Sequence, residues 1–229
     1  MPTSEQVQTR TYRSDRRESQ ARLTRQRVVT AATATFLERG YAGTTVRAIA
    51  AAAHVSVPTV EFSFGTKARL LKTVIDVAIA GDHEAVGVLD RSWAEAARRA
   101  TTVDRFLSIV AAVLAPAQTR SAGLVLAVFE GAATDAELAE LSVQLVDRRA
   151  ATAAWAVDQL THLAPLRTGC DRQEAIDTLW ILMDPAVFDR LTRRRHWTVG
   201  QYERWFAGSV ARLLVGTNDL RPSRKGRST

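Results

Sequence analysis

The side chains with the clearest chemical capacity in this chain are its arginines and lysines. The 229 residues contain 31 Lys and Arg against 24 Asp and Glu, which gives a formal net charge of +7 at pH 7 and a sequence pI of about 10.4. Both ends are basic, since residues 1–27 hold seven arginines against three acids and residues 217–229 carry a net charge of +3. Basic clusters neutralise phosphates, so this composition favours a nucleic acid as partner.

The groups that could serve catalysis or metal binding are scattered. The four histidines lack the i, i+4 pairing and the acidic neighbours that a zinc site on a helix needs. No nucleophile-elbow, phosphate-loop or dinucleotide-binding motif is present. The single cysteine, Cys170, excludes an internal disulfide and any cysteine-rich metal cluster. The sequence therefore predicts neither an enzyme nor a bound metal or other cofactor.

The elements that would carry nucleic-acid contacts lie in residues 24–71, where three short helices are predicted. Val28, Ala32 and Phe36 stand four apart and form an apolar stripe at helical period, and Gly40 follows as a stop signal. Three helices need such a stripe to share a core. This first helix therefore has one face that can be buried.

The next two helices are predicted from their capping residues. Thr45 is a plausible N-cap for a second helix, whose small side chains over residues 50–53 allow close packing. Ser56 opens a third helix, and Pro58 is tolerated only in the first turn of that helix because its missing N–H has no intrahelical partner there. The layout is that of a helix-turn-helix DNA reader.

This segment resembles the N-terminal signature of the TetR-type transcriptional regulators. The likeness covers about a fifth of the chain, without a gap, and beyond Leu71 it extends only to a general all-helical layout. The matching residues are Phe36, Arg39, Gly40, Tyr41, Gly43, Thr44, Thr45, Val46, Arg47, Ile49, Ala50, Val55, Ser56, Thr59, Phe64, Thr66, Lys67 and Leu70.

The chain departs from the family pattern at the turn and in the third helix. His54 stands where the family usually has glycine, and His tolerates a positive φ better than most non-glycine residues. Pro58 replaces Gly or Ala, Val60 replaces Leu, Glu61 replaces Tyr and Ser63 replaces His. A carboxylate at position 61 either points away from the DNA backbone or accepts a hydrogen bond from a cytosine amino group.

The resemblance implies a set of DNA contacts. Thr45 and Lys67 would hold phosphates at helix N-termini, where the helix dipole favours anions. Val57 and Pro58 would contact thymine methyl groups in the major groove. We expect the arginine-rich arm to reach phosphates or the minor groove. The expected DNA-binding residues are Arg27, Thr45, Arg47, Ser56, Val57, Pro58, Thr59, Phe62 and Lys67.

From residue 66 onward the apolar periods, together with predicted caps at Ser92, Thr134, Asp171, Asp184 and Thr198, predict helices only. No strand pattern, fixed repeat or apolar run near the roughly 18 residues of a membrane span is evident. The polar N-terminus lacks a secretory signal, so a cytoplasmic protein is expected. The predicted helices span residues 67–90, 93–99, 102–115, 121–131, 135–163, 171–183, 185–194 and 199–216.

Two of these helices, 171–183 and 199–216, carry an apolar stripe wider than one packed neighbour needs. An exposed stripe of this kind can close as a four-helix bundle between two subunits, as in the resembling family. Part of the stripe must instead serve the core of the chain itself. The expected interface residues are Leu179, Trp180, Met183, Trp205, Phe206, Val210 and Leu213.

The segment 102–163 is the predicted sensor, because TetR-like proteins carry a small-molecule cavity among corresponding helices. Taken singly, each of its apolar residues is better explained as core. Glu130 is either a buried anchor for a polar group of the ligand or a solvated residue at a helix end. The expected ligand-binding residues are Phe106, Val110, Leu114, Phe129, Glu130 and Trp155.

Together these features predict an all-α chain with an N-terminal three-helix helix-turn-helix domain and a larger helical domain for ligand sensing and dimerisation. The expected parts are a basic disordered arm (1–21), the DNA-binding domain (22–71), the helical domain (72–216) and a basic tail (217–229). The expected partners are a palindromic double-stranded operator, a second copy of the chain and a small apolar effector that relieves repression, with no membrane.

Two alternatives remain open from the sequence. One is a helical small-molecule-binding protein that has lost its affinity for DNA, which the residues at positions 54 and 61 would allow. The other is a non-specific architectural DNA-binding protein that is held by its basic ends.

Overall fold

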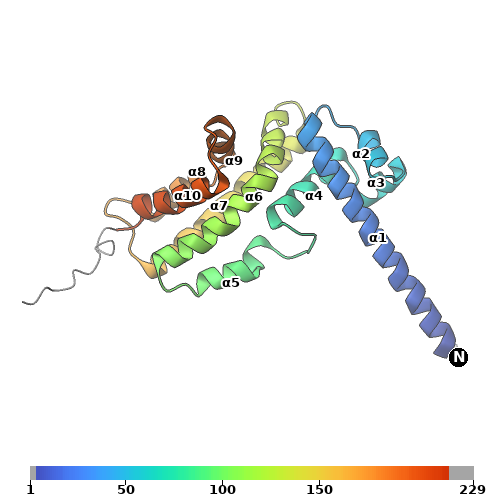
Figure 1. The fold of residues 1–229 in the computed structure, drawn as a ribbon, viewed down its shortest axis with the longest axis horizontal. Coiled ribbons are helices and arrows are strands. Elements are labelled where there is room, and N and C mark those ends of the chain that lie inside the picture. Colours follow the sequence, from blue (N-terminus) through green and yellow to red (C-terminus); the bar gives the residue numbers. More distant parts are fainter. Residues whose placement is uncertain (1–3, 217–229) are drawn as a thin grey trace, which may run out of the picture. The chain divides into compact units, whose positions relative to one another are not determined.

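The computed structural model describes the backbone of residues 4–216 and the side chains from residue 18 onward, and this part of the chain is built from helices (Figure 1). No strand forms within it apart from an isolated bridge between Leu166 and Val215. The predicted all-α class is confirmed. The helices are α1 (Ser4–Arg39), α2 (Val46–Ala52), α3 (Val57–Phe64), α4 (Lys67–Ala80), α5 (Ser92–Arg98), α6 (Val103–Gly131), α7 (Ala136–Leu163), α8 (Arg172–Leu182), α9 (Pro185–Asp189) and α10 (Val199–Leu214), with short turns η1 (Val88–Asp90) and η2 (Arg190–Arg194).

The chain forms two compact units that interleave in sequence. The first comprises the residues up to Ala78 together with Ala127–Leu141, and the second comprises Ile79–Leu126 with the residues from Ser142 onward. The end of α6 and the start of α7 therefore group with the helix-turn-helix segment. The domain boundaries drawn from the sequence remain predictions, and the basic tail at 217–229 lies outside the described residues.

Helix α1 is longer than the sequence reading expected. It runs from Ser4 to Arg39, so the expectation of disorder over residues 1–21 is wrong for the backbone from Ser4 onward. The physical reason is composition: no glycine or proline interrupts this stretch, and Arg, Gln, Glu and Ala favour helix even without an apolar period.

The first unit has the core that the apolar stripe predicted. Val28, Ala32 and Phe36 of α1 are almost completely buried, and Gly40 ends the helix at a φ of +67°. Burial of this kind, at about 25 cal/mol per Å² of apolar surface, is the main force that holds short helices in place. The other buried apolar residues of this unit include Val29, Ile49, Ala50, Ala53, Val60, Phe64, Ala68, Leu70, Leu71, Val74, Ile75 and Ala78.

The second unit is organised around α6, which the sequence reading had divided at residues 116–120. The helix is continuous because Pro116 removes only one backbone hydrogen bond, and the buried side chains of Ala115 and Ala117 on either side keep it packed. In the described chain α6 is also the one helix long and apolar enough to cross a membrane, and half of that stretch is buried inside the fold. The expectation that no segment reaches this length and composition is therefore wrong.

Helix starts after residue 90 follow the predicted caps in three cases out of five. Asp171 accepts from the N–H of Glu174, Thr198 forms a capping box, and Asp184 precedes Pro185 at the start of α9. The fourth prediction, a cap at Ser92, is wrong because this residue lies inside α5 and no side chain caps the helix.

The start of α7 and the end of α4 also differ from the prediction. Asp135, rather than Thr134, accepts from the backbone N–H of Glu137 and Leu138, because a carboxylate one residue later reaches both donors. Helix α4 ends at Ala80 and not at residue 90, since Gly81 adopts a φ of +88°.

Candidate nucleic-acid interface

The turn between α2 and α3 has the positive φ that was expected at His54, where the family usually has glycine. His54 adopts a φ of +53°, and its N–H donates to the carbonyl of Ala51 while the N–H of Val55 donates to that of Ala50. These bonds satisfy the carbonyls that the end of α2 leaves open. A non-glycine residue therefore closes this turn, at the steric cost that a positive φ carries.

Helix α3 is fixed at its N-terminus by Ser56. The Ser56 hydroxyl accepts from the N–H of Thr59 at 3.3 Å and shares a hydrogen bond of 2.7 Å with the Thr59 hydroxyl. Val57 and Pro58 occupy the first helical positions, where a proline costs no hydrogen bond. The predicted start of the third helix is confirmed.

The C-terminal end of α3 is held by α1. Nη1 of Arg25 donates to the carbonyl of Ser63 at 2.8 Å, and the guanidinium lies 4.3 Å from the centre of the Phe64 ring. From sequence, Arg25 is only one of the seven arginines of residues 1–27. The signal that could have found it is its place on α1 one turn before the buried Val28 and Val29.

Because Val60 and Phe64 are buried, the opposite face of α3 points to solvent. On that face Pro58, Glu61 and Phe62 are exposed, and the Phe62 side chain is 95% exposed. The other two predicted readers on this helix, Val57 and Thr59, are half-buried. Helix α3 thus presents a rigid outer surface, as a helix that enters a DNA groove must.

The other helices of the first unit contribute further candidate contacts. Thr45 caps α2 by accepting from the N–H of Ala48 at 3.1 Å, so its hydroxyl is engaged within the chain. Arg27 on α1 and Arg47 on α2 are exposed, as is Arg69 on α4, close to the Gly65 turn that ends α3. Arg69 was not among the predicted contacts, although it lies two residues after Lys67.

The ammonium of Lys67, for which a phosphate contact was expected, is engaged within the chain. Its ammonium donates to the carbonyls of Tyr41 and Thr44 at 2.9 and 3.0 Å and lies 3.9 Å from the centre of the Tyr41 ring. Burial lowers the pKa of Lys67, against the opposing charge of Asp135. The expected role of Lys67 as a free phosphate anchor is therefore corrected: it ties the turn before α2 to the start of α4.

Tyr41 links the same turn to the start of α7 within the first unit. Its hydroxyl donates to Oδ2 of Asp135 at 3.1 Å, and the Thr66 hydroxyl donates to Glu137 at 3.1 Å. Burial, followed by this hydrogen bond, raises the pKa of Tyr41, so the phenol stays protonated as a donor. The start of α7 is thus hydrogen-bonded to the helix-turn-helix segment.

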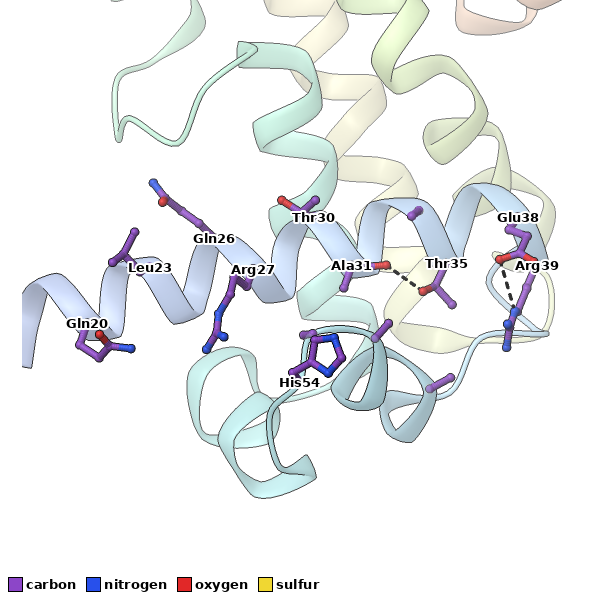
Figure 2. A pocket seen from close by; sticks show the side chains of 14 residues that line it. Gln20, Leu23, Gln26, Arg27, Thr30, Ala31, Thr35, Glu38, Arg39 and His54 are labelled. Atoms are coloured by element: carbon purple, nitrogen blue, oxygen red, sulfur yellow. Dashed lines mark hydrogen bonds and ion pairs between the residues drawn. The ribbon is translucent and has the colours of Figure 1, made fainter.

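A groove of about 820 Å³ runs along α1 next to the turn at His54 (Figure 2). Figure 2 shows Arg27 extending from α1 on the side where His54 lies. The groove contains none of the residues predicted for ligand binding. Its lining comprises Gln20, Leu23, Gln26, Arg27, Thr30, Ala31, Ala34, Thr35, Glu38, Arg39, Ala48, Ala52, Ala53 and His54.

The predicted ligand-binding residues are divided between the two units. Phe106 and Val110 are buried in the core of the second unit, and Leu114 and Trp155 pack against that core. The Trp155 ring lies 6.2 Å from that of Phe106 and 5.6 Å from that of Trp93.

The remaining two ligand-binding residues, Phe129 and Glu130, belong to the first unit. Glu130 is exposed, so the alternative of a solvated residue at the helix end holds and its expected role as a buried anchor is wrong. The physical reason is its place in the last turn of α6, one residue before Gly131.

The predicted interface residues are largely core. Leu179, Met183, Phe206 and Val210 are buried within the chain, because α8 and α10 pack together with α6 and α7. They cannot at the same time cover a partner, so their assignment to the dimer interface is wrong. Trp180 and Trp205 are half-buried, and Leu213 is 43% exposed.

No group of three His, Cys, Asp or Glu side chains that could hold a metal ion occurs in the part of the chain that the structure describes. Cys170 is a free thiol, and burial raises its pKa.

Comparison with known proteins places this segment in a family. Residues 28–74 match the family model described as "Bacterial regulatory proteins, tetR family". The resemblance drawn from the residues is thereby confirmed over this segment. No curated protein matches the chain.

Solved structures share the fold across most of the chain. SmeT in complex with triclosan is 16% identical, with a TM-score of 0.66 and coverage of 90% of this chain and 99% of that one. FadR from Bacillus subtilis in complex with stearoyl-CoA is 14% identical, with a TM-score of 0.63 and coverage of 81% and 96%. A transcriptional regulator from Rhodococcus sp. Rha1 is 20% identical, with a TM-score of 0.60 and coverage of 82% and 95%.

Proposed function

We propose that this protein is a sequence-specific DNA-binding repressor that reads a palindromic operator as a homodimer and is released by a small apolar ligand. The observation that carries the proposal is the outer face of α3, which is fixed by Ser56 at one end and by Arg25 at the other. A preorganised helix loses little conformational entropy on binding. The family match over residues 28–74 supports the same function.

In the proposed complex α3 lies in the major groove, with Val57, Pro58, Thr59 and Phe62 facing base edges. The exposed Arg27, Arg47 and Arg69 neutralise phosphates on the flanks, while Thr45 and Lys67 hold α2 and the preceding turn in position. Glu61 accepts from a cytosine amino group within the groove, since a carboxylate at the phosphate backbone would be repelled.

The dimer, in this proposal, uses the outer sides of α8 and α10. Ile181 and Leu213 are large apolar side chains that remain 55% and 43% exposed. Trp180, which precedes Ile181, and Trp205, two turns before Leu213 on α10, are half-buried and would lose their remaining exposure to the partner. A two-fold dimer presents two readers to two half-sites, which explains why a palindrome is expected.

The ligand, in this proposal, enters among the helices of the second unit, beside Phe106, Val110, Leu114 and Trp155. SmeT was solved with triclosan, which is largely apolar, and FadR from Bacillus subtilis with stearoyl-CoA, whose acyl chain is apolar, and both support a ligand with a large apolar part. A ligand that lowers DNA affinity must itself bind more weakly when the operator is present, because coupling between two sites is reciprocal.

Selection of duplexes from a random pool by the full-length protein tests the proposal. We expect a palindromic consensus that is bound at least a thousandfold more tightly than random duplex at physiological salt. Binding without a consensus would indicate the architectural alternative. An absence of binding would indicate a ligand-binding protein that has lost its affinity for DNA.

A further inference from the structure

Among the described residues Phe62 is the large apolar side chain most exposed to water, at 95%, and it lies on α3. The aromatic ring covers none of the core, which this helix reaches through Val60 and Phe64 instead. The stability of the fold therefore gives no reason for an aromatic side chain at this position.

A second exposed apolar residue lies beside Phe62 on the same face. Pro58 is four residues earlier in the same helix, so the two side chains are neighbours one turn apart. Neither side chain can donate or accept a hydrogen bond. The pair can therefore offer a partner only apolar and aromatic-ring contacts.

The chemical surroundings of this pair favour a base edge over the DNA backbone. Glu61, which is adjacent and exposed, carries a negative charge that phosphates repel. With only two apolar side chains, the surface is also far smaller than the roughly 800 Å² per partner of a stable protein–protein interface. Of the groups on base edges in the major groove, the apolar one is the C5-methyl of thymine, which phenylalanine is known to contact.

We infer that Pro58 and Phe62 read thymine methyl groups in the operator. Residues four apart in a helix are separated by about 6 Å along its axis, and base pairs by about 3.4 Å along DNA. The two methyl groups thus lie within about two base pairs of each other in each half-site. This inference rests on the proposed function and specifies the operator that it requires.

The test replaces single thymines with uracil in the duplexes that the full-length protein selects from a random pool. Uracil lacks the methyl group and retains every hydrogen-bonding group, so only apolar contact is removed. For the wild-type protein we expect one or two thymines per half-site at which this replacement weakens binding about fourfold, the equivalent of one buried methyl group. The other thymines should tolerate it.

A protein variant identifies the side chain that senses the methyl group. In Phe62→Ala the operator should bind more weakly, and the same thymine-to-uracil replacement should then cause no further loss at the position that Phe62 reads. Leu37→Ala is the matched control, since it also truncates an exposed apolar side chain, on α1, and should retain full sensitivity to uracil. The uracil replacements are measured with the wild-type protein, so this test holds even if a variant does not fold.

The outcomes separate this inference from the function on which it rests. A palindromic consensus whose thymines can all be replaced by uracil without loss would overturn the inference and leave the proposed function standing. An equal loss with uracil in Phe62→Ala and in the wild type would also overturn the assignment to Phe62. A pool that yields no consensus would overturn both.

Discussion

Phe62 in α3 and Phe206 in α10 have the same side chain in opposite environments. Both lie in helices with apolar residues at helical spacing, and from sequence both were assigned to surfaces that meet another molecule. In the structure Phe62 is 95% exposed, whereas Phe206 is fully buried and stacks on Tyr202 with ring centres 6.3 Å apart.

The difference lies in how many neighbours each helix has inside the chain. Helix α3 buries one side only, through Val60 and Phe64. Helix α10 contributes to two core clusters, one of which contains Phe206 and the other Tyr202, and the Tyr202 hydroxyl donates to the carbonyl of Leu182. An apolar stripe wider than one neighbour needs can thus be covered by two neighbours of the same chain. Exposure, more than apolar content, separates a binding surface from a core.

The largest expected effect is the loss of stability on truncating Phe206, compared with the same truncation at Phe62. Phe206→Ala should lower the free energy of unfolding by about 3–5 kcal/mol, because it leaves a cavity between packed helices. Phe62→Ala should change it by less than about 0.5 kcal/mol, since no core contact is removed. Urea denaturation followed by circular dichroism measures both variants. Equal losses in the two would contradict the comparison.

The second effect concerns Lys67, which ties the turn before α2 to the start of α4 in the first unit. Lys67→Met should destabilise the protein by about 1–3 kcal/mol, because the carbonyls of Tyr41 and Thr44 lose the bond from the ammonium and the Tyr41 carbonyl keeps only the N–H of Thr44. In the refolded variant the slope of log affinity against log salt should stay unchanged. Arg47→Met, whose side chain is exposed, should reduce that slope by about 1 and leave the stability as it is.

DNA titration at several salt concentrations, together with thermal melting, distinguishes these two roles. If Lys67→Met reduces the salt slope and leaves the melting temperature unchanged, Lys67 is a phosphate contact after all.

The third prediction concerns the part of α10 that remains exposed. Leu213→Glu should weaken the proposed dimer by at least tenfold, since a charge at an apolar interface loses its hydration, while the chain stays folded. Analytical ultracentrifugation over a range of concentrations gives the dimer dissociation constant. Val143→Glu, at another exposed apolar position, is the control. A dimer that tolerates the charge at position 213 would place the interface elsewhere.

The smallest effect is a pH dependence at the start of α7. The backbone N–H of Leu138, and then the Tyr41 hydroxyl, hold the pKa of Asp135 below its usual value. A depressed pKa in the folded state means that this contribution to stability is complete above the unfolded pKa of about 4 and is lost as the pH falls through the folded pKa. Asp135→Asn keeps an acceptor for the cap and should flatten the acid limb of the stability curve below pH 4.

Thermal melting between pH 2.5 and 7 measures this difference between Asp135→Asn and the wild type. Asp177, which is exposed on α8, offers a control in Asp177→Asn. Identical acid limbs in Asp135→Asn and the wild type would show that this cap does not contribute to the pH dependence.

The amino-acid sequence by itself determined the local features of this protein. The stripe of Val28, Ala32 and Phe36, the caps at Thr45 and Ser56 and the positive φ at His54 follow from residue types over a few neighbouring positions. Helix periodicity, hydrogen-bond capping and backbone sterics act over one or two turns, so they can be recognised without a partner.

The tertiary structure alone decided which side chains are accessible. Three contacts come from distant positions in the chain. They are the carbonyls that accept from Lys67, the Phe64 ring that contacts Arg25, and the helices that cover Phe206. The same is true of α6, where packing on both sides sustains a helix through Pro116 that local signals had divided. Burial depends on contacts between segments far apart in sequence, and a one-dimensional pattern shows which face of a helix is apolar but not what covers it.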